Sequence, residues 1–169
     1  ARDARRITQL LGKAILEAHG LARGLFPISL EADDLRSALG ELAANIHDIY
    51  KISCRLICTK PVLIEDSSAA MNLFRIAQEA IQNAIKHGKA TRIVIRLSKK
   101  NETVELAVKN NGKGLPQHFE KRQGMGLKIM DHRASMIGAE LQVQRVATGG
   151  TLLTCSLRSK GDKLSKSTK

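Results

Sequence analysis

Aromatic side chains are scarce in this chain, which has no Trp, one Tyr and three Phe among 169 residues. Proteins that bind single-stranded nucleic acid stack the bases on aromatic side chains, so this composition argues against that class. The net charge of +12 would otherwise suggest nucleic acid. Residues 1–27 carry +3 of it and residues 158–169 carry +4, so the 130 residues between them carry only +5. We therefore expect no nucleic-acid partner.

Long apolar runs and cysteine clusters are also missing. No run approaches the ~18 residues of a membrane-spanning helix, and there is no signal peptide. The chain starts with Ala1 rather than Met, which suggests a piece of a longer protein. Cys54 and Cys58 lie in one strand-like segment about 13 Å apart, at ~3.3 Å per residue, which is too far for a disulfide. With Cys155 alone and no zinc-ligand spacing, we expect reduced, buried thiols and a cytoplasmic domain.

The hydrophobic residues, 43% of the chain, suffice for one core and recur with the periods of regular structure. Their spacing predicts helices at residues 3–25, 30–49, 66–87 and 127–137. It predicts strands at residues 55–57, 92–97, 103–109, 140–145 and 151–157. The Lys/Ser-rich tail from Ser159 onward is expected to be disordered.

Four polar residues share one face of the helix predicted at 66–87, because positions three, four and seven apart lie on the same side of a helix. They are Asn72, Glu79, Asn83 and Lys86. A carboxylate and an amide oxygen suit Mg²⁺, so Glu79 and Asn83 could hold that ion over a triphosphate. A solvated polar face is the simpler alternative for these residues taken alone.

Glycine-rich segments follow this helix. Asn110-Asn-Gly112-Lys-Gly114 would let the backbone approach a planar base closely, although such a segment alone is more often a tight turn. Gly124-Met125-Gly126-Leu127 would place backbone amides at a helix N-terminus, where the helix dipole favours phosphate. Gly149-Gly150-Thr151 predicts a hairpin turn whose Thr151 hydroxyl could face the same pocket.

In this order the segments resemble the catalytic ATP-binding domain of sensor histidine kinases, in the wider family that includes gyrase, Hsp90 and MutL. The segment from Glu79 to His87 resembles the N box, Asn110–Gly114 the first glycine box and Gly124–Leu127 the second. The Lys86-His87 ending and Gly149-Gly150-Thr151 resemble those of the subgroup typified by nitrate-responsive and membrane-fluidity sensor kinases.

The resemblance implies an α/β sandwich of the Bergerat type, with a mixed, mostly antiparallel sheet, helices on one face and a preceding N-terminal helix. Residues 1–27 would be the second helix of the dimerisation and phosphoacceptor hairpin. Residues 28–158 would be the catalytic domain, with a mobile lid between the glycine boxes, and residues 159–169 a disordered basic tail. The intact protein would be a homodimer, and the cytoplasmic location of this domain allows a membrane-anchored parent.

The resemblance also implies a set of roles, with ATP and Mg²⁺ as cofactors. Asn83 would ligate Mg²⁺ and Glu79 would assist at the γ-phosphate. The implied nucleotide-binding residues are Asn83, Lys86, His87, Asn110, Gly112, Gly114, Gly124, Met125, Gly126, Leu127 and Thr151. The γ-phosphoryl group would pass to a histidine on a missing hairpin helix and then to a response regulator receiver domain.

None of the five histidines has a matching acceptor context, so this chain is not expected to phosphorylate itself. They are His19, His47, His87, His118 and His132.

One residue departs from the pattern: Asn110 stands where the family has the aspartate that accepts a hydrogen bond from the adenine amino group. Replacing a charged acceptor by a neutral amide is expected to weaken binding by about 1 to 2 kcal/mol. The amide could also donate to a guanine O6, which would relax base selection. Asn110 thus leaves open a second reading, a degenerate nucleotide-binding scaffold with weak or absent kinase activity.

Overall fold

The computed structural model describes residues 34–114 and 124–158. The predictions for residues 1–33, for the lid and for the tail at 159–169 fall outside these ranges. The described elements are α2 (Asp34–Tyr50), β1 (Ser53–Ile57), α3 (Ser67–Lys86), β2 (Arg92–Lys100), β3 (Thr103–Asn110), α4 (Met125–Met136), β4 (Ala139–Arg145) and β5 (Thr151–Arg158).

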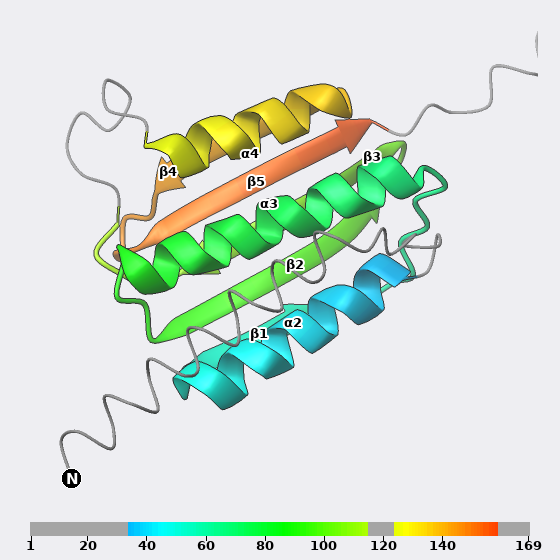
Figure 1. Ribbon diagram of the computed structural model, residues 1–169. Helices are drawn as coiled ribbons and strands as arrows, with labels where there is room; N and C mark the ends of the chain where they lie inside the picture. Colours follow the sequence, from blue (N-terminus) through cyan, green and yellow to red (C-terminus); the bar gives the residue numbers. More distant parts are fainter. Residues whose placement is uncertain (1–33, 115–123, 159–169) are drawn as a thin grey trace, which may run out of the picture.

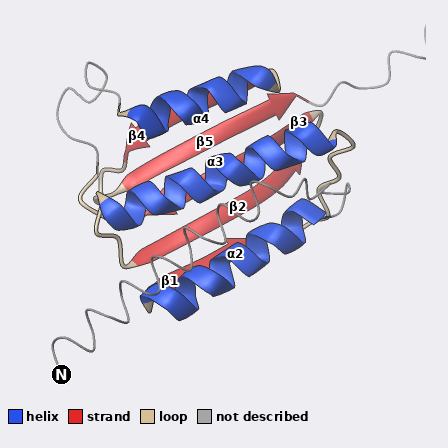
Figure 2. Cartoon of the chain, viewed as in Figure 1, coloured by secondary structure: helices blue, strands red, loops and turns tan. Residues whose placement is uncertain are grey.

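The five strands form one sheet in the order β1-β2-β3-β5-β4. β1 and β2 are parallel, whereas the other neighbours are antiparallel. The helices α2, α3 and α4 lie side by side across one face of the sheet (Figure 1), so the described chain has a helix layer and a strand layer (Figure 2). The predicted fold class, a mixed and mostly antiparallel sheet with helices on one face, is confirmed.

Alternation along the strands explains why the helices cover one face only. Every second residue of the central strands is buried under the helices, because successive strand side chains point to opposite faces. Those residues are Ile93, Ile95 and Leu97 in β2, Val104, Leu106 and Val108 in β3, and Leu153, Cys155 and Leu157 in β5. The residues between them include Arg96, Glu105 and Lys109, which are exposed on the open face.

The hairpin between β2 and β3 is tighter than the sequence suggested. β2 continues past Leu97, where the prediction ended it, to Lys100, which pairs with Thr103. Asn101, with φ 53°, forms the turn, and Asn tolerates this left-handed conformation better than most residues. The pairing with β3 therefore adds residues to the strand that have no apolar pattern of their own.

The central helix α3 begins where the sequence predicted. The carboxylate of Asp66 accepts hydrogen bonds from the backbone amides of Ser68, at 2.8 Å, and Ala69, at 3.3 Å, which caps the helix N-terminus. The helix ends at Lys86, and the backbone amide of His87 donates to the carbonyl of Asn83. The end of α3 therefore lies within the first predicted motif, Glu79–His87.

The three cysteines are free thiols. Cys155 is buried, but Cys54 and Cys58 are only half-buried, and Cys58 lies just beyond the end of β1. Burial raises the pKa of the Cys54 and Cys155 thiols to about 11, so both stay protonated and unreactive at neutral pH.

Within the described residues, no helix has both the length and the apolar character needed to cross a bilayer.

Candidate functional site

The predicted motifs on α3 and α4 meet in space. Gly126, in the first turn of α4, faces Glu79 and Asn83 of α3: a Cβ built on Gly126 would lie 3.1 Å from Nδ2 of Asn83 and would overlap Oε1 of Glu79. Glycine at this position lets the N-terminus of α4 approach the carboxylate and the amide. Gly124 is the N-cap residue and has no side chain to bond the first amides of α4, and no other side chain within the described ranges caps them.

The first glycine segment packs against the end of the same helix. A Cβ on Gly112 would lie 2.5 Å from the carbonyl oxygen of Gly88, and the backbone amide of Lys113 donates to that oxygen at 2.8 Å. The sequence predicted that Gly112 makes room for a base. In the structure Gly112 also has to make room for the backbone of Gly88, which links the two motifs.

Asn110 ends β3 with its side chain almost enclosed, at 9% exposure. Its Oδ1 accepts a hydrogen bond from the backbone amide of Gly112 at 3.0 Å. On the next strand Thr151 is its direct partner in the β3–β5 register, and directly paired residues point to the same face of a sheet. Asn110, Gly112 and Thr151 thus share one end of the sheet, as the sequence suggested.

Gly114 and the β4–β5 hairpin complete this end of the sheet. Gly114 has φ +77° and a Cβ there would lie 3.0 Å from the carbonyl oxygen of Gly150 and 3.4 Å from Nε of Arg145. The hairpin glycines, Gly149 and Gly150, have φ of +94° and +91°, a conformation that favours glycine. The predicted hairpin turn is confirmed, and it lies directly beside the first glycine segment.

Asn111 connects the turn after β3 to the segment after α3, a role that its residue type and position in the sequence did not indicate. Its Oδ1 accepts from the backbone amides of Thr91, at 3.0 Å, and Arg92, at 2.8 Å. Its Nδ2 donates to Oγ1 of Thr91 at 2.9 Å. These contacts fasten the turn after β3 to the segment that follows α3, so Asn111 fixes the position of Asn110 and Gly112 relative to that helix.

We expect Asn111→Ala to lower the free energy of unfolding by about 0.5–1.5 kcal/mol, because the hydrogen bonds that fasten this turn are lost while water can reach the exposed Thr91 and Arg92. Asn111→Asp should lose less, since its carboxylate still accepts from both backbone amides. Urea denaturation measures the difference, with the exposed Asn45 of α2 changed to Ala as the control. Equal stability of Asn111→Ala and the unchanged chain would contradict the role assigned to this side chain.

Two polar residues of α3 lie apart from Glu79 and Asn83. Asn72 is 6% exposed; its Nδ2 donates to the carbonyl of Ser68 at 2.9 Å and its Oδ1 accepts from Nη1 of Arg133 at 3.3 Å. It therefore connects α3 to α4 and belongs to the structure rather than to an open polar face. The sequence could not show this, because Arg133 lies 61 positions further along the chain.

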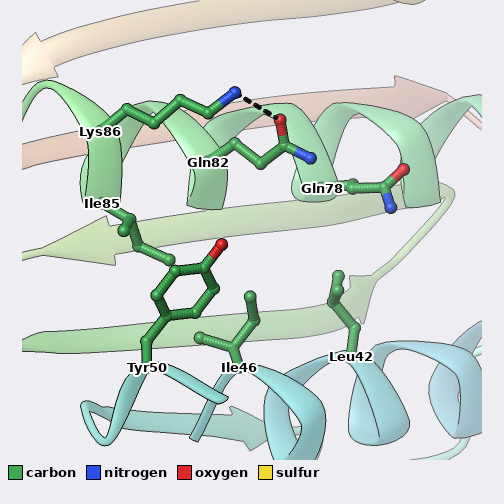
Figure 3. A pocket seen from close by; sticks show the side chains of 7 residues that line it. All are labelled: Leu42, Ile46, Tyr50, Gln78, Gln82, Ile85 and Lys86. Carbon is green, nitrogen blue, oxygen red and sulfur yellow. Dashed lines mark hydrogen bonds between the residues drawn. The ribbon is translucent and has the colours of Figure 1, made fainter. Parts of the chain in front are cut away.

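Lys86 lies on the flank of α3 that faces α2. Its Nζ is 3.4 Å from Oε1 of Gln82, and both side chains line a pocket between the two helices (Figure 3). The other lining residues are Leu42, Ile46, Tyr50, Gln78 and Ile85. Glu79 and Asn83 face Gly126 of α4 instead, so the structure does not bring the ammonium group of Lys86 to them.

The remaining predicted residues are distributed around the two helix ends. His87 is exposed at the C-cap of α3. Met125 is 78% exposed at the start of α4, and Leu127 packs against the core. Among residues 34–114 and 124–158 no three His, Cys, Asp or Glu side chains cluster as a metal cage. An ion such as Mg²⁺ can instead be held by one or two protein oxygens together with substrate phosphates.

The fold and the meeting of the three motifs define an ATPase-type domain. Residues 68–161 match the family described as histidine kinase-, DNA gyrase B-, and HSP90-like ATPase, and the chain belongs to this family.

Among its relatives, the chain is 30% identical to the nitrate/nitrite sensor protein NarQ of Escherichia coli (strain K12), over 92% of this chain and 28% of that protein. It is 33% identical to the sensor histidine kinase LiaS of Bacillus subtilis (strain 168), over 87% of this chain and 40% of that protein. The chain therefore spans well under half the length of these relatives.

Solved structures show the same fold. The ATP-binding domain of PrrB from Mycobacterium tuberculosis superposes with a TM-score of 0.65 at 24% identity, covering 74% of this chain and 93% of that one. The histidine kinase domain of the E. coli osmosensor EnvZ gives a TM-score of 0.63 at 17% identity, covering 86% of this chain and 98% of that one. At these identities the likeness concerns the fold alone.

Proposed function

We propose that this chain is the kinase domain of a sensor histidine kinase: it binds Mg-ATP and delivers the γ-phosphoryl group to a histidine on a separate hairpin helix. From that histidine the group would pass to the aspartate of a response regulator receiver domain. The observation that carries the proposal is the approach of Gly126 to Glu79 and Asn83, because it joins a carboxylate, an amide and a helix N-terminus at one place.

The phosphate end of the site would lie between α3 and α4. Within the described ranges the first amides of α4 have no side-chain cap, and a helix N-terminus favours anions through its amides and its dipole. Asn83 would offer its amide oxygen to Mg²⁺, and bound Mg²⁺ would neutralise charge on the triphosphate. Glu79 would hold its carboxylate beside the γ-phosphate. Phosphoryl transfer requires mainly such positioning.

The part of the site that binds the purine base would lie at the end of the sheet that carries Asn110. Asn110 is enclosed there beside Gly112 and opposite Thr151, and Gly114 adds a stretch of backbone without a side chain. A flat purine could approach this glycine-rich surface closely. The exposed His87 and Met125 would lie nearer the phosphates, and Lys86 would have to leave Gln82 to join them.

Partners and domain limits belong to the same proposal. Residues 1–27 would be the second helix of the dimerisation and phosphoacceptor hairpin, through which the intact protein would form a homodimer. Residues 28–158 would form the catalytic domain, and residues 159–169 would be a disordered basic tail. The domain would work in the cytoplasm, next to the receiver domain that it serves. We do not expect the chain to phosphorylate any of its own histidines.

A degenerate scaffold is the alternative, and Asn110 is the residue that favours it. A neutral amide in place of a carboxylate removes a charge-assisted hydrogen bond. If that loss silences the site, the domain would act by binding other proteins.

Transfer of labelled phosphate from Mg-ATP to a phosphoacceptor hairpin, supplied as a separate polypeptide, tests the proposal. We expect transfer by this chain and a loss of roughly tenfold or more in Asn83→Ala, which removes an oxygen ligand of the ion. Gln78→Ala is the matched control, since Gln78 is on the same helix but lines the α2 side. Failure of the chain to bind the Mg²⁺ complex of any purine nucleoside triphosphate in calorimetry would overturn the kinase proposal and favour the scaffold.

A further inference from the structure

We propose that this site recognises the purine through N–H donors and accepts a 6-oxopurine nucleoside triphosphate, such as guanosine or inosine triphosphate, at least as well as ATP. The inference rests on the proposed nucleotide site and concerns which base that site selects. Two side chains carry it, Asn110 at the end of β3 and Arg145 at the end of β4.

The orientation of the Asn110 amide is fixed by its neighbour. The backbone amide of Gly112 lies 3.0 Å from Oδ1, and a backbone N–H can only donate, so the oxygen must face it. The NH₂ group therefore points away from Gly112. A free rotation of the amide, which the sequence alone would permit, is excluded by this hydrogen bond.

The NH₂ group of Asn110 faces accessible space. The side chain makes no other hydrogen bond within the described parts of the chain, and there no enclosed side-chain nitrogen or oxygen lacks a partner. The amide nitrogen must consequently reach the molecular surface at this end of the sheet, although the residue as a whole is only 9% exposed. This is a donor held in place and left available for a ligand.

An aspartate at this position would present the opposite group. Asp and Asn have the same shape, and one carboxylate oxygen would take the hydrogen bond from Gly112. The second oxygen would then stand where Asn110 has its NH₂ group. The change from Asp to Asn therefore replaces one acceptor by one donor at a single point of the proposed base-binding surface.

Arg145 supplies further donors at the same end of the sheet. It pairs with Thr151 in the β4–β5 register, and Thr151 pairs with Asn110, so the three residues form one row across the sheet. A Cβ on Gly114 would lie 3.4 Å from Nε and 3.5 Å from Cγ of Arg145. The guanidinium stem thus lies against the first glycine segment, and a guanidinium can donate but not accept.

The two donors favour an oxygen at position 6 of the purine. Adenine presents an amino group there, which would oppose the NH₂ group of Asn110 donor to donor. Guanine and hypoxanthine present O6, which accepts from an amide or a guanidinium, as arginine shows in its common pairing with the O6 and N7 edge of guanine in DNA. A site that leaves a ligand donor and its own donor unpaired loses affinity.

Calorimetric titration of the chain with the Mg²⁺ complexes of ATP, GTP and inosine triphosphate tests this inference. Inosine triphosphate lacks the 2-amino group of GTP, so it isolates the effect of the 6-oxo group. We expect both 6-oxopurine nucleotides to bind at least as tightly as ATP. In Asn110→Asp the preference should move toward ATP by roughly tenfold or more, since one donor has become an acceptor.

Arg145→Ala provides an independent arm and should weaken GTP and inosine triphosphate more than ATP. Arg96→Ala, on the open face of the sheet, is its control. ATP binding that exceeds inosine triphosphate binding tenfold in both the unchanged chain and Asn110→Asp would overturn the inference, while leaving the kinase proposal intact. Absence of binding by all three nucleotides in every folded variant would overturn both.

Discussion

Gly126→Ala is expected to leave the domain folded and to weaken Mg-ATP binding roughly tenfold or more, the effect of losing a hydrogen bond or contact to a charged group. The new Cβ would overlap Oε1 of Glu79 and crowd Nδ2 of Asn83. The end of a flexible side chain can move away, so the fold survives and the carboxylate is displaced. Alanine inside a helix is also more stable than glycine by up to ~1 kcal/mol.

The matched control for this variant is Gly40→Ala. Gly40 lies within α2, and a Cβ there meets only Cδ2 of Leu56, at 3.9 Å. Calorimetry should give unchanged ATP affinity for Gly40→Ala and a weaker affinity for Gly126→Ala, with the domain folded in both. Full ATP affinity in Gly126→Ala would show that Glu79 and Asn83 do not need their observed positions to bind the nucleotide.

Gly150→Ala is expected to have the largest effect on stability, a loss on the order of 3 kcal/mol or more in the free energy of unfolding. Gly150 has φ +91° and a Cβ there would overlap the backbone carbonyl of Asn110 on the neighbouring strand. A backbone atom within the sheet cannot move aside as a side-chain end can. Relief would require β3 and β5 to separate at the end of the sheet that carries Asn110 and Thr151.

Gly138→Ala separates the two causes of the stability lost in Gly150→Ala, which are the positive φ and the overlap with the carbonyl of Asn110. Gly138 has φ +67°, but a Cβ there meets nothing within 4 Å, so this variant has the backbone strain without the overlap and should lose only about 1–2 kcal/mol. Urea denaturation of the two variants measures both values. Equal losses would show that the overlap with Asn110 contributes nothing.

The sequence determined the elements of this protein and the position of its motifs along them. Periods of two and 3.6 residues located the described helices and strands, and the Gly149-Gly150 turn marked the boundary between β4 and β5. These features depend on residues close together in the chain. The glycine positions also indicated close approaches: Gly112 meets the backbone of Gly88, and Gly126 meets the side chain of Glu79.

Only the tertiary structure decided which polar groups are available to a ligand. Asn72 is enclosed because Arg133 of α4 reaches it, and Lys86 lies with Gln82 on the side of α2. Asn111 forms its hydrogen bonds with Thr91 and Arg92, across the end of the sheet. The orientation of the Asn110 amide is set by its hydrogen bond with the backbone amide of Gly112. The partners of Asn72 and Asn111 lie 61 and 19 to 20 positions away and are brought near only by folding. Those of Lys86 and Asn110 are local, at four and two positions. Hydrogen bonds form only at short range and in suitable directions, so residue type and spacing alone could not show which of these side chains are bonded.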